Sequence, residues 1–467
     1  SNYGSFPQNT VASAINAGYS LKNVDLYGFG TFTERDSVLD FTFRAPGNNR
    51  NVPEIYPFGF RPREEIRERD YELVFGGRGE VGAFAYDLSA SYGTNETDWV
   101  NTQGINASLG TSSPTFFDLG GIDAEEFIVQ FDATRQVSLS GAGTLQTSFG
   151  FQHRREGFEI HEGERLSYID GGNGAPPGAQ GFPGFAPEAV TDIDRKNNNA
   201  YLEFGWDPSD RLYLSAAGRF EDFSDASGSE FVYKLSGRYE LTPTLSTRAS
   251  FNTGFRAPSI QQLGFRGSRG QFQDLDNDGI AETIVLRQTL PGTDPAAQAL
   301  GAAPLTPETS RNFSVGVVFQ PFTTVDLTVD FYRIEVDDRI ALSTQFNRGD
   351  NRATASDTTI GEEISALLDA AGFDASLGGL NYFTNAIDTT SQGVDVVLTW
   401  DLETTLGQFA NSVAFNYNDD EVSKVKANPA ALSGLVFQDG EILQQFDRAR
   451  LATYAREIPP SKLVLSS

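Results

Sequence analysis

The feature that most constrains the fold of this chain is a strict alternation of apolar and polar residues. Between positions 325 and 332 every second residue is apolar, at Val325, Leu327, Val329 and Phe331. The same period of two returns at 212–220, 245–251, 313–319, 394–402 and 413–417. Because successive side chains of a β-strand point to opposite faces, each stretch predicts a strand with one apolar and one polar face. Only 360–371 has helical spacing, and we expect a short surface helix there.

The connections between these stretches differ in length in a regular way. Tight turns rich in Pro, Gly, Asn and Asp are expected at 21–23, 78–82, 139–143, 208–210, 242–243, 320–323, 403–407 and 458–461. Much longer segments lie between them, at 35–69, 95–125, 157–197, 254–308, 335–390 and 419–448. Short and long connections therefore largely alternate, which places the short ones at one end of the sheet and the long ones at the other.

This segregation of loops by length favours an all-β fold built as a large antiparallel transmembrane β-barrel. The hairpins predict about 16 strands, each long enough to cross a bilayer when tilted. A soluble β-sandwich or propeller is the alternative, because it also alternates apolar and polar residues. Its strands would be shorter, and its loops would not sort by length. The barrel is therefore the better interpretation.

The amino-acid composition argues against several classes of function. The 467 residues include no Cys, so disulfide frameworks, thiolate zinc sites and cysteine nucleophiles are excluded. The net charge of −28 argues against a nucleic-acid partner, because an acidic chain repels the phosphate backbone. No Met is present either, so residue 1 is not a translation start, and we expect a processed or truncated product. No apolar run approaches the length of a transmembrane helix, but barrel strands hide their lipid face from such averages.

Several motifs resemble those of one family. Residues Gly254, Phe255, Arg256, Ala257, Pro258 and Ser259 match the "GFRAPS" segment of TonB-dependent outer-membrane receptors letter for letter. Leu305–Asn312, Asp330–Ile340 and Asn385–Asp395 resemble further family motifs and follow in the family's order. Ala200–Asp222 and Arg154–Tyr168 are also similar, so the resemblance covers most of the chain.

The resemblance implies a 22-strand barrel that encloses an N-terminal plug and draws energy through a TonB box. This chain shows neither plug nor TonB box, so we expect residues 1–467 to be a single, partial barrel domain, open or incomplete. The implied partners are outer-membrane lipid, the TonB complex through the missing N-terminal region, and an extracellular small-molecule or oligosaccharide ligand. The implied location is the outer membrane of a Gram-negative bacterium.

The function implied is active uptake of a scarce, large ligand such as a ferric siderophore, cobalamin or an oligosaccharide. The alternative is a passive, plugless porin-like barrel or a surface adhesion barrel. The net negative charge of the chain disfavours an anionic cargo. A local cluster of arginines could still attract one, at Arg61, Arg63, Arg67 and Arg69.

One acidic loop resembles half of a calcium site. Asp274, Asp276 and Asp278 occupy positions 1, 3 and 5 of an EF-hand-type loop, followed by the Gly that permits its sharp turn. Position 12, where a bidentate Glu belongs, is Val285. We therefore weigh a Ca²⁺ ion in an extracellular loop against a solvated acidic loop, and expect no other cofactor.

The remaining candidates favour structural roles. Arg256 either contacts a plug or lies at a strand end paired with a lumen carboxylate, and we favour the second. His153 and His161 lie across a strand-to-loop transition and are expected to be ordinary strand-end residues rather than metal ligands. No nucleophile elbow accompanies the Ser, His and Asp residues, so we do not expect an enzyme.

Overall fold

The protein is a curved, open antiparallel sheet. The computed structural model describes residues 6–273, 283–405, 407–455 and 459–467, which form eighteen strands. Fifteen of these make the main sheet: β1 (Gln8–Ser20), β2 (Val24–Asp40), β3 (Arg63–Val81), β4 (Phe84–Gln103), β5 (Phe117–Leu139), β6 (Gly143–His161), β7 (Thr191–Ser209), β8 (Leu212–Phe223), β9 (Ser229–Thr242), β10 (Leu245–Arg256), β13 (Glu308–Phe322), β14 (Val325–Leu342), β16 (Leu377–Thr404), β17 (Gly407–Val425) and β18 (Ser461–Ser466).

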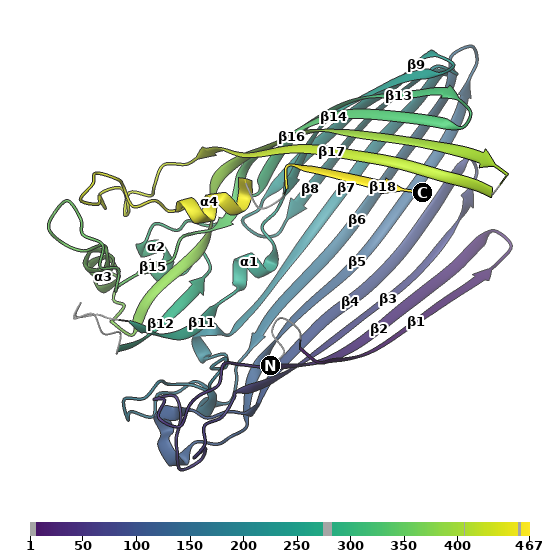
Figure 1. The fold of residues 1–467 in the computed structure, drawn as a ribbon. Helices are drawn as coiled ribbons and strands as arrows, with labels where there is room; N and C mark the ends of the chain where they lie inside the picture. The colour runs from purple at the N-terminus through teal and green to yellow at the C-terminus, as the bar shows by residue number, and fades with distance from the viewer. Residues whose placement is uncertain (1–5, 274–282, 406, 456–458) are drawn as a thin grey trace.

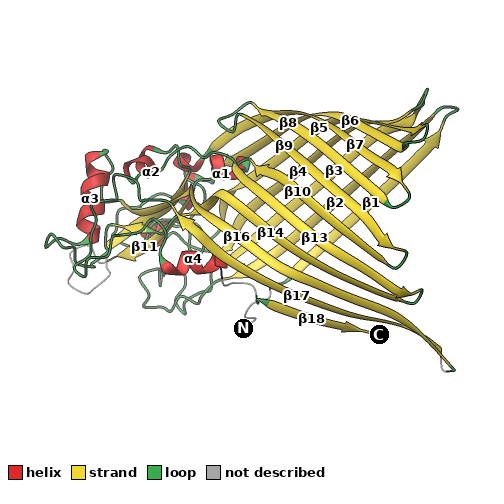
Figure 2. Cartoon of the chain, turned by 90° about the horizontal axis from the view of Figure 1, so that it is seen from above, coloured by secondary structure: helices red, strands yellow, loops and turns green. Residues whose placement is uncertain are grey.

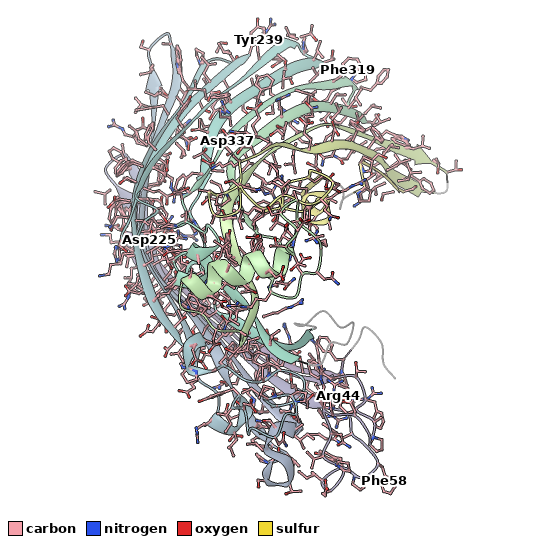
Figure 3. All side chains as sticks on the ribbon, turned by 90° about the vertical axis from the view of Figure 1, so that its left-hand side faces the viewer. Arg44, Phe58, Asp225, Tyr239, Phe319 and Asp337 are labelled. Carbon is pink, nitrogen blue, oxygen red and sulfur yellow. The ribbon has the colours of Figure 1, made fainter. Side chains whose placement is uncertain are left out.

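Each strand of the main sheet pairs antiparallel with the next one along the sheet, as a meander (Figures 1 and 2). Within the described residues, β1 pairs only with β2 and β18 only with β17, so the sheet does not close. Figure 3 shows the result as an open arc. The predicted large, antiparallel and open barrel-type sheet is therefore confirmed.

Short turns join the strands at one end, and longer loops join them at the other, except for the five-residue connection between β8 and β9. We call these the turn end and the loop end. The prediction of a tight hairpin at 458–461 is wrong. Ile458 lies outside the described residues, and Ser461 begins β18 at the end of a connection that starts after β17 and contains α4 (Arg448–Ala455). Pro459 and Pro460 therefore end a long loop and do not form a hairpin turn. The main sheet consequently has one strand fewer than the roughly 16 that the hairpins predict.

The alternation seen in the sequence becomes two faces of the sheet. Ala249, Val315, Phe331 and Val394 lie side by side in register on four neighbouring strands. The exposed side chain of Phe331 (37%) shows that this row faces outward. Phe313, two residues before Val315 on the same face of β13, is 45% exposed. A belt of such apolar residues crosses the convex face, whereas polar residues occupy the opposite face.

The polar face is held together by hydrogen bonds between strands. The Tyr201 hydroxyl donates to Asp132 at 2.6 Å, and Asn199 donates to Gln152 at 2.9 Å. Arg248 on β10 reaches across β13 to Asp330 on β14, with its Nε 2.8 Å from Oδ1. This contact is possible because Gly316 lies between them and has no side chain. The concave face is thus a polar lining.

The loop end carries its own small structure. β12 (Thr283–Leu290) pairs antiparallel with β11 (Gly267–Gln273) and parallel with the first residues of β16, and β15 (Phe346–Asn347) adds a short edge. Beside this small sheet lie α2 (Pro295–Ala299) and α3 (Ile360–Ala370), the latter confirming the predicted helix. Among the described residues, no helix is long and apolar enough to cross a membrane.

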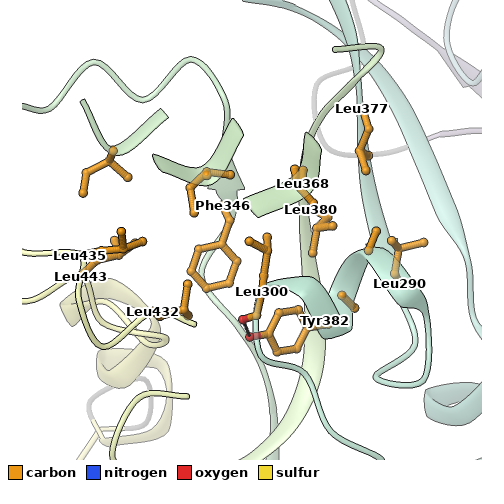
Figure 4. Close-up of a cluster of buried hydrophobic side chains, with 14 residues drawn as sticks. Leu290, Leu300, Phe346, Leu368, Leu377, Leu380, Tyr382, Leu432, Leu435 and Leu443 are labelled. Atoms are coloured by element: carbon orange, nitrogen blue, oxygen red, sulfur yellow. Dashed lines mark hydrogen bonds between the residues drawn. The ribbon is translucent and has the colours of Figure 1, made fainter. Parts of the chain in front are cut away.

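A buried hydrophobic cluster fixes these loops in place (Figure 4). Leu300, Leu368 and Leu380 are fully buried in it, around the ring of Tyr382. The Tyr382 hydroxyl donates to the Leu300 carbonyl at 2.7 Å and accepts a hydrogen bond from Gln445. Since burial of this size stabilises by about 1.5–3 kcal/mol per large apolar side chain, the loop end is a packed unit rather than a set of free loops.

Candidate functional site

The motifs that resemble those of the receptor family meet at the loop end of the sheet. Arg256, the last residue of β10, donates from Nε to Glu308 on β13 at 3.0 Å. The backbone N–H of Ile340 on β14 donates to the same carboxylate at 2.7 Å. Arg256, expected either to contact a plug or to pair with a carboxylate, thus forms an ion pair with Glu308 that ties three strands together.

A fourth motif joins the same network. The side-chain NH₂ of Asn385 on β16 donates to the carbonyls of Thr306 at 2.8 Å and Asp338 at 2.7 Å. Its side-chain oxygen accepts from the Thr306 N–H at 2.9 Å. Asp338 has a left-handed backbone conformation, with φ of 58°, which leaves its carbonyl free to reach Asn385. These motif residues therefore build the rim from which the loops arise.

Pro258, in the second half of the GFRAPS segment, is bound by Arg195, a residue that lies outside the sequence motifs. Arg195 on β7 is 4% exposed and donates from Nη1 to the Pro258 carbonyl at 2.6 Å. Its guanidinium also pairs with Glu156 at 2.8 Å and lies 3.5 Å from Asp225. Ser259 then caps α1 (Ile260–Gly264) through a capping box with Gln262. The segment is thus a structural anchor for the loop that follows.

Beyond this rim, a cleft of about 480 Å³ opens on the concave side. One wall is aromatic and comes from β4 and the long loop after β6, with Trp99 and Phe185 at 5.8 Å and Phe182 and Phe185 at 5.0 Å, both edge to face. Phe265, which follows α1, completes this wall. The cleft therefore offers ring faces and edges to any molecule that enters.

The opposite wall of the cleft is polar. It consists of Arg287 and Gln288 on β12, Asn381 on β16, and Arg450 on α4. A second cleft, of about 760 Å³, continues past Gln288 and is lined in part by Tyr168 and Arg165. The two share Gly267 and Ser268, so they form a groove between the N-terminal and C-terminal groups of loops. Sequence reasoning missed this groove, because its residues come from segments about 350 positions apart.

One buried carboxylate positions the aromatic wall. Glu64 is 3% exposed at the loop end of β3, well beyond the outward-facing Leu73 and Phe75 of that strand. Its carboxylate accepts a hydrogen bond from the backbone N–H of Phe182. Burial raises the pKa of Glu64 to about 7, and the hydrogen bond only partly offsets this rise. Glu64 thus holds the cleft loop through a group that titrates near neutral pH.

Both histidines lie on β6, so the predicted strand-to-loop transition between them is wrong: His153 is inside the strand, and His161 is its last residue. His153 shares a hydrogen bond with Asn198 at 2.8 Å, whereas His161 lies 2.7 Å from Asp123 and 3.2 Å from Glu159. Across the described residues, no group of three or more His, Asp or Glu side chains is arranged to hold a metal ion. Asp274, Asp276 and Asp278 lie outside the described residues, so calcium binding there stays a prediction.

Three of the four arginines in the predicted cluster, Arg63, Arg67 and Arg69, are paired with carboxylates. Arg63 lies 2.9 Å from Asp40, and Arg67 lies 3.0 Å from Asp36. Arg69 pairs with Asp98 at 3.1 Å. The charges of these three arginines are therefore balanced locally, which leaves little excess charge from them to attract an anionic cargo.

Comparison with known proteins agrees with the geometry. Residues 5–463 match the family described as "TonB dependent receptor-like, beta-barrel". Among curated proteins, no sequence matches significantly.

Solved structures share the fold at low sequence identity. The siderophore receptor PirA from Pseudomonas aeruginosa is 12% identical, with a TM-score of 0.51, over 88% of this chain and 63% of that one. A variant of the ferric enterobactin receptor PfeA from the same organism is 13% identical, with a TM-score of 0.53, over 89% and 52%. The RagAB peptide transporter is 10% identical, with a TM-score of 0.52, over 90% and 47%. The chain therefore spans roughly half to two thirds of these relatives.

Proposed function

Because the chain belongs to the TonB-dependent receptor β-barrel family, we propose that it is the barrel portion of an outer-membrane active transporter in a Gram-negative bacterium. The exposed apolar belt on the convex face supports the membrane location. Phe75, Leu88 and Leu202 project from it with 66%, 52% and 45% of their surface exposed, an arrangement suited to lipid rather than water. The polar concave face would then line the passage.

The groove at the loop end is the place where the cargo would first bind. Its orientation follows from the barrel family, in which short turns face the periplasm and long loops face the outside. An aromatic wall opposite a wall with two arginines suits a ligand that carries both ring surfaces and negative charge. A ferric siderophore of the catecholate type combines these properties. Cobalamin and neutral oligosaccharides match the arginines less well.

The observation that carries this proposal is the family match over residues 5–463 together with a groove at the family's ligand-facing end. Uptake against a gradient also requires coupling to the TonB complex, which this barrel would receive through a region outside the present sequence. A passive porin-like barrel is the competing function, and it differs by needing neither TonB nor a binding groove.

Binding can be tested on the full-length protein in detergent with ferric enterobactin as the probe. Phe182→Ala and Arg450→Gln remove one contact from each wall of the groove, and we expect each to weaken binding by about tenfold. Phe58→Ala is the matched control, since Phe58 is 86% exposed on a loop outside the groove. If ferric enterobactin and a hydroxamate siderophore both fail to bind the wild-type protein, the siderophore assignment is wrong.

A further inference from the structure

The small sheet at the loop end has two different faces. Along the first residues of β16, Leu380 and Tyr382 are fully buried in the hydrophobic cluster, together with Phe346 of β15 (Figure 4). Because side chains of a strand alternate between its faces, Asn381 between them points to the opposite side. There it lies beside Thr289 of β12, its partner in the strand register, and both line the cleft of about 480 Å³. One face of this sheet is therefore core, and the other is a wall of the groove.

Asn381 is buried, but only half of its hydrogen-bonding capacity is used. The residue is 5% exposed, and its Oδ1 accepts a hydrogen bond from the Thr289 hydroxyl at 2.8 Å. Among the described residues, its Nδ2 has no acceptor. Buried side-chain amides in folded proteins normally have partners, so a missing partner indicates a place for an acceptor from outside the chain. The two amide hydrogens of Asn381 are thus available to a molecule in the cleft.

Gln345 adds a second amide to the same wall. It directly precedes Phe346 and is half-buried, and its side chain lines the cleft. Neither atom of its terminal amide has a hydrogen-bond partner in the part of the chain that the structure describes. A half-turn about the last side-chain bond exchanges the nitrogen and the oxygen, so a ligand with an acceptor can bind the nitrogen. Asn381 and Gln345 together therefore offer donors on one wall.

The charge of the cleft fits this donor wall. The chain has 63 acidic residues, yet none of those that the structure describes lines this cleft, so no carboxylate competes for the amide hydrogens. Arg450 lines the same wall, and the rings of Phe182 and Phe185 lie on the opposite one. Donors facing rings suit a flat group whose edge carries oxygen acceptors without donors. A catecholate ring has this chemistry, because its deprotonated oxygens only accept hydrogen bonds.

We propose that Asn381, assisted by Gln345, determines the ligand specificity of the groove by donating hydrogen bonds to the oxygens at the edge of a catecholate ring. This inference rests on the siderophore uptake proposed above, and it names the residues that distinguish one ligand from another. Thr289 binds the amide oxygen of Asn381 and so orients its hydrogens. A ligand that carries its own donors at this edge leaves the buried N–H groups unpaired and binds more weakly.

The test compares ferric and iron-free enterobactin on the full-length protein in detergent. In the ferric complex the catechol oxygens are deprotonated, whereas in the iron-free form they carry O–H donors. Asn381→Leu keeps the approximate size of the side chain but removes its N–H groups. We expect it to weaken binding of the ferric form on the order of 10- to 100-fold, and binding of the iron-free form by less than about threefold. The preference for the ferric form should therefore fall.

Two further variants complete the comparison. Gln345→Leu changes a residue that is less buried than Asn381, and we expect it to weaken binding of the ferric form by roughly threefold to tenfold. Gln146→Leu is the matched control, since it makes the same exchange at an exposed position near the turn end of β6. It should leave both affinities unchanged.

The outcomes separate this inference from the function on which it rests. Tight ferric binding by the wild-type protein, with an unchanged preference in Asn381→Leu and Gln345→Leu, would overturn the inference and leave siderophore uptake standing. An equal loss of affinity for both forms of the ligand would also overturn it, because it would show that Asn381 only supports the structure. Failure of the wild-type protein to bind any ferric siderophore would instead overturn the proposed cargo, and this inference with it.

Discussion

At the scale of single residues, Glu64 is the group whose charge matters most for the groove. It is buried, and it holds the backbone of Phe182, which forms part of the aromatic wall. Its pKa rises from 4.5 to about 7, so the folded protein binds this proton more tightly than the unfolded chain does. The stability of the Phe182 loop should therefore fall as pH rises from about 4.5 to about 7, and level off above that.

We expect Glu64→Gln to abolish this pH dependence, because the amide stays neutral and its oxygen still accepts from Phe182. The effect in the wild-type protein is up to about 3 kcal/mol. Hydrogen exchange of the Phe182 amide, corrected for its intrinsic rate, should be more protected at pH 5 than at pH 8. Equal protection at both pH values in the wild-type protein would show that Glu64 does not control this loop.

Arg195 is the second residue with a clear expected effect. Its side chain is 4% exposed, forms ion pairs with Glu156 and Asp225, and donates a hydrogen bond to the Pro258 carbonyl. Arg195→Ala leaves those acceptors buried without a donor, so we expect a loss of roughly 3–5 kcal/mol in the free energy of unfolding. Arg35→Ala, which breaks the half-exposed pair with Glu68, should cost less than about 1 kcal/mol. Thermal unfolding of both variants in detergent measures the difference, and similar costs would contradict this account.

At the scale of elements, Gly316 decides how three strands fit together. A Cβ added there would lie only 1.9 Å from Asp330 Oδ1, because Arg248 and Asp330 meet across β13 at this position. Gly316→Ala should therefore break that ion pair and destabilise the sheet by roughly 1–3 kcal/mol. Gly93→Ala on β4 is the control, since its Cβ would have only ordinary contacts. Unfolding midpoints for the two variants should differ, and a neutral Gly316→Ala would show that the pair contributes little.

The strands and the loop contacts differ in how far the local sequence encodes them. Strands such as β13 and β14 were predictable, because a period of two is a local pattern enforced by an apolar face and a polar face. The pairing of β12 with β16 was not, since it is parallel, joins residues about 90 positions apart and involves few residues. The GFRAPS segment was found through its resemblance, but its partner Arg195 had no signal beyond an ordinary charged position in a strand. The groove depends on the packing of loops, which local patterns do not encode.

At the scale of the whole molecule, the sheet has the curvature and the two faces of a large barrel, but its edges are open. Strands β1 and β18 each present one unpaired side among the described residues, and β1 is exposed along its whole length. Unpaired strand edges in a bilayer cost several kcal/mol per group. We therefore expect the full-length protein, and not residues 1–467 alone, to insert into vesicles as a heat-modifiable barrel on gel electrophoresis. Stable insertion of the isolated segment as a monomer would contradict this expectation.

An energised transporter needs TonB for uptake, and this requirement separates it from a passive channel. The requirement is tested most directly by the uptake of radiolabelled iron, supplied as ferric enterobactin, in cells whose only siderophore receptor is the full-length protein, with and without TonB. We predict that both strains bind the complex at the surface, and that only the strain with TonB accumulates iron. Equal accumulation in the absence of TonB would show that the protein is a passive channel instead.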